Sequence, residues 1–262
     1  MEILLTNDDG IGCEGLGKLA GALRSRTNHK VWVLAPEIDR SGVSHGLTIL
    51  GNPVRFMEVE KDTWSCSGQP VDCVLTGVLG GIPDMNPGIV LSGINRGPNL
   101  GTDIIYSGTA AAARQAALMG IPAIAFSLAG HSDFCWDMAA EYAADHLGEF
   151  LDMWEQDTFI NVNIPNTSSG PGGIKKTWPA LKNYHDRLEL IKSEAGVGWC
   201  FLRAGDQTVE REDGSDWDTV SRNMVSASPV FIHPVVSRNA CAAAPDYASV
   251  GSRRPSGPEK RG

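Results

Sequence analysis

Apolar and polar positions alternate in blocks along the first two-thirds of the chain. Four short runs are continuously apolar, as in strands buried on both faces of a sheet, at residues 3–5, 31–34, 89–91 and 121–126. Between them, apolar residues recur with the spacing of one helical face, at residues 16–23, 70–78, 110–119 and 136–154. Strict alternation over residues 160–164 predicts one more strand. These repeated strand–helix–strand units predict an α/β fold with a mostly parallel sheet flanked by helices.

Two parts of the chain depart from this rhythm. Alternating residues at 51–66 predict a hairpin insertion, and from about Thr167 glycine, proline, serine and charged residues become frequent. The last residues have the composition of a solvated tail, with five basic and two acidic residues over 237–262. We therefore predict an α/β core, an extended β-rich C-terminal region and a flexible tail, at residues 1–166, 167–234 and 235–262.

The chain has 262 residues, of which 42% are hydrophobic and 20% are charged, as in ordinary globular proteins. Its net charge of −9 argues against binding a nucleic acid duplex, because phosphates would be repelled over most of its surface. No apolar run approaches the ~20 residues that span a bilayer, and the acidic start is unlike a signal peptide. Its six cysteines form no CxxC pair, which argues against a zinc site and a disulfide framework. We therefore expect a soluble, cytoplasmic protein with free thiols and no membrane contact.

Two adjacent carboxylates, Asp8 and Asp9, follow the first predicted strand. Ligands bind at the carboxyl edge of open parallel sheets, and two neighbouring like charges are costly unless a cation neutralises them. A hard divalent cation such as Mg²⁺ or Mn²⁺ would do so through oxygen ligands. The same residues also fit a solvated Asp-Asp-Gly turn, so the pair alone leaves both interpretations open.

Two further loops are predicted at the same edge. The loop at 40–48 is rich in hydroxyls and small residues, which suits contacts to metal or phosphate, and its His45 also fits a surface histidine. The longer loop at 92–106 carries glycines that permit close backbone approach. It leads into residues 107–109 at the start of an alanine-rich helix, where free N–H groups and the helix dipole favour phosphate. Ser107 also fits a helix cap, and capping is compatible with anion binding.

An acidic pair, a hydroxyl loop and a phosphate cradle at one edge together indicate phosphoryl transfer or phosphate ester hydrolysis. The chain lacks the GxxxxGK[ST] motif of P-loop ATPases, a GxGxxG after the first strand and the GxSxG nucleophile elbow. Two non-catalytic interpretations remain open, a receiver-like phosphate-binding protein and a nucleotide-binding protein without catalysis. Receiver domains are much shorter and need a lysine after a late strand, which the segment after residue 126 lacks.

These loops resemble those of the SurE family, the survival-protein 5′-nucleotidases. The resemblance covers roughly residues 1–234 and is carried by ILLTNDDGI at 3–11, VLAPEIDRSGVSHGLT at 33–48, SGQPVDCV at 67–74, VLSGINRGPNLGTDIIYSGTAAAARQAALMGIPAIAFS at 90–127, FINVNIPN at 159–166 and DWDTVSRNMVSASPV at 216–230. The combination of NDDG with the run from SGIN to YSGT is far more specific than either part. The chain departs from the family pattern at 171–191, where Lys182-Asn183-Tyr184 stands in place of the common Gly-Arg-x-Tyr.

The resemblance implies a Rossmann-like core and a smaller C-terminal arm region through which subunits associate, so a homodimer or homotetramer is expected. It implies one divalent cation per subunit (Mg²⁺, Mn²⁺ or Co²⁺), with protein ligands at Asp8, Asp9, Ser41 and Asn95. It also implies catalytic roles for the two aspartates and phosphate contacts from Asn99, Ser107, Gly108 and Thr109. Both His45 and Arg96 are candidates to assist the leaving group.

The activity that the resemblance implies is metal-dependent phosphomonoester hydrolysis. Its expected substrates are nucleoside 5′- and 3′-monophosphates, which would yield nucleoside and phosphate. Some family members also act on short polyphosphate, so this substrate is included in the expectation.

Overall fold

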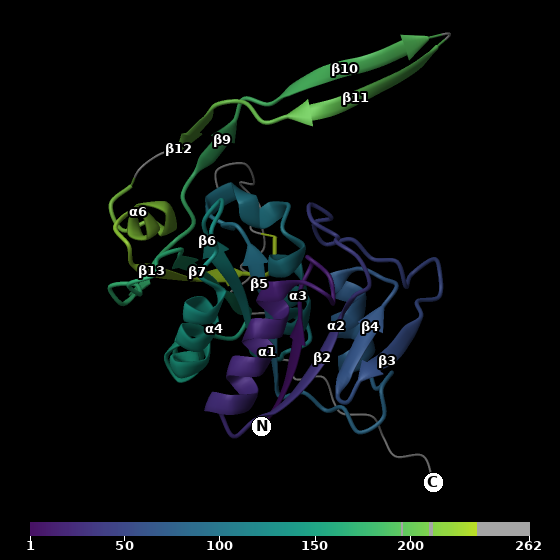
Figure 1. Ribbon diagram of the computed structural model, residues 1–262, viewed down its shortest axis with the longest axis vertical. Coiled ribbons are helices and arrows are strands. Elements are labelled where there is room, and N and C mark those ends of the chain that lie inside the picture. The colour runs from purple at the N-terminus through teal and green to yellow at the C-terminus, as the bar shows by residue number, and fades with distance from the viewer. Residues whose placement is uncertain (195, 210–211, 235–262) are drawn as a thin grey trace, which may run out of the picture. The chain divides into compact units, whose positions relative to one another are not determined.

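The computed structural model describes residues 1–194, 196–209 and 212–234, and these form a nine-stranded sheet with helices on both faces (Figure 1). The strand order in this sheet is β3-β4-β2-β1-β5-β6-β7-β13-β8. Its strands are β1 (Glu2–Thr6), β2 (Lys30–Pro36), β3 (Phe56–Glu60), β4 (Thr63–Cys66), β5 (Ile89–Arg96), β6 (Ala123–Ala129), β7 (Thr158–Pro165), β8 (Ile174–Lys176) and β13 (Val225–Phe231). In the run β4-β2-β1-β5-β6-β7, each strand is parallel to its neighbours. This confirms the predicted α/β class with a mostly parallel sheet.

The central strand β1 is buried on both faces. Leu4 packs into one hydrophobic core, whereas Ile3 and Leu5 pack into another. Successive side chains of a strand point to opposite faces, so a continuous apolar run needs cover on both. Helices α1 (Glu14–Arg26) and α4 (Trp136–Asp145) cover one face, and α2 (Pro70–Val78) and α3 (Gly108–Leu118) cover the other. None of the helices in the described ranges is long and apolar enough to cross a membrane.

The strand order reverses at β1, which pairs in parallel with β2 on one side and β5 on the other. In open α/β sheets, such a reversal leaves a crevice outside the carboxyl ends of the strands, where ligands bind. The loops that follow β1, β2 and β5 all begin at this edge. The fold therefore brings together three loops that lie far apart in the sequence.

Two segments differ from the predicted pattern. The single helix expected at 136–154 is two helices, α4 and α5 (Leu147–Asp152), with a break at His146. At this break the Tyr142 carbonyl oxygen accepts the His146 N–H at 3.1 Å, and the His146 Nδ1 atom lies 3.0 Å from the same oxygen. The strand expected at 89–91 continues to Arg96, because the polar end of β5 still pairs with β6. Part of the loop expected at 92–106 is a 3₁₀ helix, η1 (Gly101–Ile105).

The C-terminal part contributes β8 and β13 to the main sheet and also forms two separate antiparallel pairs (Figure 1). These pairs are β9 (Lys182–Tyr184) with β12 (Gln207–Val209), and β10 (Arg187–Glu194) with β11 (Val197–Arg203); α6 (Asp216–Ser221) follows them. Strands on both sides of residue 166 thus share one sheet, and the predicted domain division there stays a prediction. The predicted tail at 235–262 lies outside the described residues.

Candidate metal and phosphate site

The loop after β1 is tightly turned and carries the two predicted metal carboxylates. Asn7 closes it, with Nδ2 donating a hydrogen bond to the Gly10 carbonyl at 2.9 Å. Gly10 has a φ of +100°, and a Cβ there would lie 3.0 Å from the backbone carbon of Ile38, so only glycine fits without strain. The Arg40 N–H donates to the Asp8 carbonyl at 2.7 Å. This bond ties the loop after β2 to the loop after β1.

The Asp8 side chain lies against the first turn of α3. Its Oδ1 accepts a hydrogen bond from the Thr109 hydroxyl, and a Cβ on Gly108 would lie only 2.9 Å from its Oδ2. Asp8 is 3% exposed, and this burial raises the pKa of its carboxyl, while hydrogen bonds from Thr109 and Gly108 act in the opposite direction. The ionised carboxylate is therefore costly here unless a positive charge approaches it.

Asp9 is half-buried beside Asp8. Burial raises the pKa of the Asp9 carboxyl to about 6, and the neighbouring carboxylates of Asp8 and Asp39 add to the rise. The Arg96 N–H donates to Asp9 Oδ2 at 3.0 Å, which joins the loop after β1 to the end of β5. The two adjacent carboxylates thus repel one another in a partly desolvated place.

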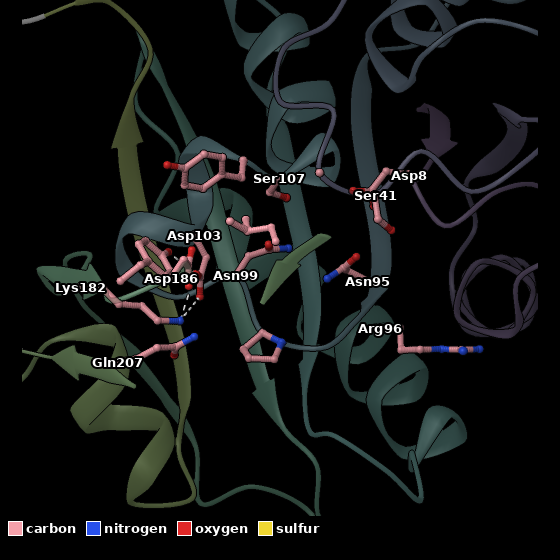
Figure 2. A pocket seen from close by; sticks show the side chains of 15 residues that line it. Asp8, Ser41, Asn95, Arg96, Asn99, Asp103, Ser107, Lys182, Asp186 and Gln207 are labelled. Atoms are coloured by element: carbon pink, nitrogen blue, oxygen red, sulfur yellow. Dashed lines mark hydrogen bonds and ion pairs between the residues drawn. The ribbon is translucent and has the colours of Figure 1, made fainter. Parts of the chain in front are cut away.

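Ser41 and Asn95 each direct an uncommitted oxygen acceptor to the same place. The N–H and hydroxyl of Ser41 donate to Asp39 Oδ1 at 2.7 and 2.6 Å, which leaves the lone pairs of the Ser41 oxygen available. The Nδ2 of Asn95 donates to the Gly97 carbonyl at 3.0 Å and so fixes the orientation of the amide. Figure 2 shows the amide oxygen of Asn95 on the side that faces Asp8 and Ser41.

One cavity of about 500 Å³ collects most of the predicted site (Figure 2). Among the predicted residues, its lining contains Asp8, Ser41, Asn95, Asn99 and Ser107. Three predicted residues do not line it, namely Asp9, Gly108 and Thr109. Asp9 follows Asp8 in the sequence, and the other two lie against the Asp8 side chain. The Thr109 side chain is wholly buried and its hydroxyl is bonded to Asp8, so the structure places it against a carboxylate and away from the cavity surface.

A network of buried amides fixes Asn99 at the cavity wall. Asn163 in β7 donates to the Asn99 carbonyl at 3.0 Å and accepts the Asn99 N–H at 2.9 Å. Asn161 donates to the same carbonyl at 2.9 Å, and Asn99 Nδ2 donates to the Ser127 hydroxyl oxygen at 2.9 Å. Since an amide nitrogen carries two hydrogens, Asn99 keeps one for a ligand in the cavity.

Ser107 caps α3, with its Oγ accepting the Ala110 N–H at 3.0 Å. Its hydroxyl hydrogen and the positive end of the helix dipole remain directed at anions, so capping and phosphate binding are both possible. Of the two candidate leaving-group residues, Arg96 lines the cavity. The His45 ring lies instead 3.0 Å from the Gln115 side-chain oxygen, outside the residues that line the cavity.

The available donors fit a hard divalent cation. The four predicted ligands offer two carboxylates, a hydroxyl and an amide carbonyl, all oxygen atoms of the kind that Mg²⁺ and Mn²⁺ prefer. Nearby, the Oδ1 of Asn7 is buried and has no hydrogen-bond partner among the described residues. No three His, Cys, Asp or Glu side chains cluster into a metal site in the described part of the chain. A cation here would therefore depend on Ser41 and Asn95 as well as on the two carboxylates.

The other end of the cavity is formed by residues that the sequence did not single out as functional. They come from η1, β9, β12 and the segments beside them, and include Asp103, Tyr106, Lys182, Tyr184, Asp186, Leu202 and Gln207. Asp103 and Tyr106 stand in the long loop at 92–106, so a charged and an aromatic residue there were an available signal. Lys182 and Tyr184 stand where the common Gly-Arg-x-Tyr of the family is replaced, which was also an available signal. Asp186, Leu202 and Gln207 had none, because contacts over such separations leave no local pattern.

Comparisons with known proteins agree with this architecture. A family model described as survival protein SurE matches residues 3–186. Among curated proteins, the chain is 39% identical over 236 residues to a 5′-nucleotidase SurE of Geobacter sulfurreducens, with 88% of each chain covered. It is 48% identical over 171 residues to a 5′-nucleotidase SurE of Treponema pallidum, with 62% of this chain and 89% of that protein covered.

Solved structures include a similar chain. The crystal structure of SurE protein from Aquifex aeolicus matches with a TM-score of 0.77 and 34% sequence identity. The match covers 90% of this chain and 95% of that chain. The likeness thus extends over nearly the whole fold, including its C-terminal part.

Proposed function

The chain belongs to the survival protein SurE family, and on that premise we propose that it is a 5′-nucleotidase, which hydrolyses nucleoside 5′-monophosphates to nucleoside and phosphate. The observation that carries the proposal is the buried Asp8 carboxylate at the start of α3, in one cavity with Ser41, Asn95, Asn99 and Ser107. Oxygen ligands for a cation and donors for a phosphate thus line the same space. This combination suits metal-assisted hydrolysis of a phosphomonoester.

We assign the cation to Asp8, Asp9, Ser41 and Asn95. A bound divalent cation supplies Lewis acidity toward a phosphoryl oxygen and neutralises its negative charge. Asp8 and Asp9 hold that charge in place, and the Thr109 hydroxyl orients Asp8 through its hydrogen bond. Whether Mg²⁺, Mn²⁺ or Co²⁺ is used is decided by a metal panel, since all three accept oxygen ligands of this kind.

We assign the phosphate to Asn99, Ser107 and the N–H groups at the start of α3, including that of Gly108. These donors are already oriented, by the amide network around Asn99 and by the cap at Ser107. Preoriented donors stabilise charge that develops in the transition state without reorganisation. Arg96 also lines the cavity, and Figure 2 shows its side chain directed away from Asn99 and Ser107.

We further propose that nucleoside 3′-monophosphates and short polyphosphate are substrates, since the assigned donors contact phosphate alone. A cytoplasmic location is proposed as well, and the cysteines that the structure describes, Cys13, Cys66, Cys73, Cys135 and Cys200, are all unpaired as a reducing compartment would keep them.

We also propose that two copies associate through the arm, which is the β10–β11 strand pair. Seven large apolar side chains of the arm are exposed, and among them Leu188, Trp199 and Phe201 are 69%, 63% and 56% exposed. Exposed apolar patches of this kind mark interaction surfaces. A second copy of the chain presents the same surface, so a homodimer, or a homotetramer built from two of them, follows.

The test is phosphate release from AMP and p-nitrophenyl phosphate by the purified chain with Mn²⁺, Mg²⁺ or Co²⁺, and again with EDTA. Asp8→Ala and Asp9→Ala should each lower turnover about 100-fold or more, and EDTA should abolish it reversibly. The same panel includes 3′-AMP and tripolyphosphate. Binding of AMP without phosphate release under any metal would mean a nucleotide-binding protein and would refute the proposal.

A further inference from the structure

The cavity extends well beyond the donors assigned to cation and phosphate. Past Ser107 it is also lined by Asp103, Tyr106, Lys182, Tyr184 and Gln207. Figure 2 shows Asp103, Lys182 and Gln207 grouped at this end of the cavity. A phosphate alone does not need this space. What lies next to the phosphate in a nucleotide is the ribose, followed by the base.

Asp103 is held by two neighbours from β9. Lys182 Nζ donates to both of its carboxylate oxygens, at 3.0 and 2.7 Å, and the Tyr184 hydroxyl donates to Oδ1. The Lys182 side chain is only 6% exposed, whereas that of Asp103 is 21% exposed. Both side chains line the cavity, and the carboxylate is the more exposed member of the pair.

This ion pair lets a carboxylate lie near a bound phosphate without strong repulsion. An unpaired carboxylate would repel the substrate dianion, but the ammonium of Lys182 offsets the charge of Asp103 at hydrogen-bond distance. Lys182 is in turn committed to Asp103, and it also lies 5.6 Å from the centre of the Trp217 ring. It is thus a positioning residue for Asp103 and not a free phosphate ligand.

Asp103 retains room for one more donor. An ionised carboxylate accepts about four hydrogen bonds. Among the described residues its Oδ1 accepts from Lys182 and Tyr184, and its Oδ2 accepts from Lys182. The free position on Oδ2 suits a neutral hydroxyl donor, and the bond would be charge-assisted.

An aromatic surface lies beside this carboxylate. Tyr106 is 57% exposed, and its ring stands edge-on to the Tyr184 ring, with centroids 6.1 Å apart and an interplanar angle of 84°. Tyr106 directly precedes the helix cap Ser107, so its ring is attached next to the phosphate donors. An exposed ring in that place offers a face on which a base can stack.

We propose that Asp103, positioned by Lys182 and Tyr184, binds a ribose hydroxyl of the substrate and selects ribonucleotides over deoxyribonucleotides. The proposal rests on the nucleotidase function proposed above and adds a nucleoside subsite to it. Tyr106 supplies the adjoining surface for the base. The three polar residues accept and orient a hydroxyl, and none of them contacts the phosphate.

The wild-type chain tests the proposal first, with Mn²⁺ and four substrates: AMP, 2′-deoxy-AMP, 3′-deoxy-AMP and p-nitrophenyl phosphate. We expect kcat/KM for AMP to exceed that for at least one of the deoxynucleotides about 10-fold or more, as for loss of a hydrogen bond to a charged group. Equal kcat/KM for all three nucleotides would overturn the proposal. Absence of phosphate release from every substrate, p-nitrophenyl phosphate included, would instead refute the nucleotidase function itself.

In the Asp103→Asn variant, kcat/KM for AMP should lie within about 2-fold of kcat/KM for the deoxynucleotide. Turnover of p-nitrophenyl phosphate should stay unchanged. Asp186→Asn is the matched control, because it removes the same charge from an exposed residue at the same end of the cavity, and it should keep the wild-type ratio. The double variant Asp103→Asn with Lys182→Met avoids an unpaired buried ammonium and should behave like Asp103→Asn. An equal loss of kcat/KM for AMP and for p-nitrophenyl phosphate would assign Asp103 a structural role and contradict the proposal.

Discussion

At the scale of single residues, the site depends on side chains that orient the proposed ligands through hydrogen bonds. The Thr109 hydroxyl donates to Asp8, the Asp39 carboxylate accepts from Ser41, and Asn163 holds the backbone of Asn99. Partners of this kind orient metal and phosphate ligands and raise their affinity. Their contribution can be measured separately from that of the ligands themselves.

Thr109→Val should lower the affinity for Mn²⁺ about 10-fold. The substitution keeps the shape of the side chain but removes the hydroxyl that donates to Asp8 Oδ1, and loss of such a supporting partner costs 10–100-fold in metal affinity. Isothermal titration with Mn²⁺ measures the change. Thr109→Ser retains the hydroxyl and should bind like the wild type; equal affinity for all three proteins would show that the hydrogen bond does not support the ion.

The acidic pair could be predicted from the sequence, but its supporting partners could not. Asp8 and Asp9 are adjacent and follow an apolar run, which is a local signal. Asn161 and Asn163 stand on a buried strand, where alternation predicts only which face they occupy. That they bond to Asn99, more than 60 residues away in the sequence, follows from the parallel sheet and not from the pattern.

At the scale of elements, the position of α3 decides whether Asp8 can be accommodated. The helix begins at Gly108, and a Cβ on that residue would lie 2.8 Å from the Asp8 Cβ. The absence of a side chain lets the carboxylate approach the helix start. Helix propensity alone would favour alanine here, so the glycine is explained by the contact.

Gly108→Ala should lower kcat/KM for p-nitrophenyl phosphate about 100-fold, because a displacement of a ligand by about 1 Å has an effect of that size. The matched control is Gly17→Ala in α1, where no atom lies within 4 Å of the added Cβ. This control should keep full activity and gain about 0.5–1 kcal/mol in the free energy of unfolding. Steady-state kinetics and urea unfolding measure both effects, and full activity in the first variant would disprove the proposed contact.

The arm is the second element with a testable consequence. Replacing Trp199 and Phe201 together by serine should raise the dissociation constant of the proposed dimer at least about 100-fold, since each buried aromatic contributes about 1.5–3 kcal/mol. Analytical ultracentrifugation measures the change. The control replaces Met57 and Val59 of β3, which are 48% and 45% exposed, and should leave assembly unchanged. Assembly that persists in the arm variant would place the interface elsewhere.

The elements of the core could be predicted from the sequence, whereas those of the C-terminal part could be foreseen only in outline. Continuous apolar runs mark β1, β2 and β6, because strands buried on both faces need no polar positions. The arm strands are exposed throughout their described side chains, so no buried face imposes a period on them. The return of β13 into the main sheet depends on pairing with β7, which no local pattern encodes.

At the scale of the whole molecule, cation and fold should stabilise one another. Burial raises the pKa of both Asp8 and Asp9. At neutral pH the ionised pair therefore destabilises the folded state when no cation is bound. A cation that binds the folded state alone removes this cost. Asp9 joins the loop after β1 to the end of β5, and Asp8 joins it to the loop after β2 and to α3, so the effect should reach the whole core.

Mn²⁺ at about 100 times its Kd should therefore stabilise the chain by about 2.7 kcal/mol. For a chain of this size, the melting temperature should rise by about 5–10 °C. Calorimetry with and without EDTA measures the shift. In the double variant Asp8→Asn with Asp9→Asn the shift should vanish; an undiminished shift would assign the stabilising ion to another place.

We propose above all that Asp8, Asp9, Ser41 and Asn95 hold one divalent cation at the carboxyl edge of the sheet. Anomalous diffraction from crystals soaked in Mn²⁺ tests it most directly, because manganese is located independently of any assumed ligand. We predict a single strong peak per subunit, about 2–2.5 Å from an oxygen of each of the four side chains. A peak bound elsewhere, with these four oxygens out of its reach, would contradict the claim.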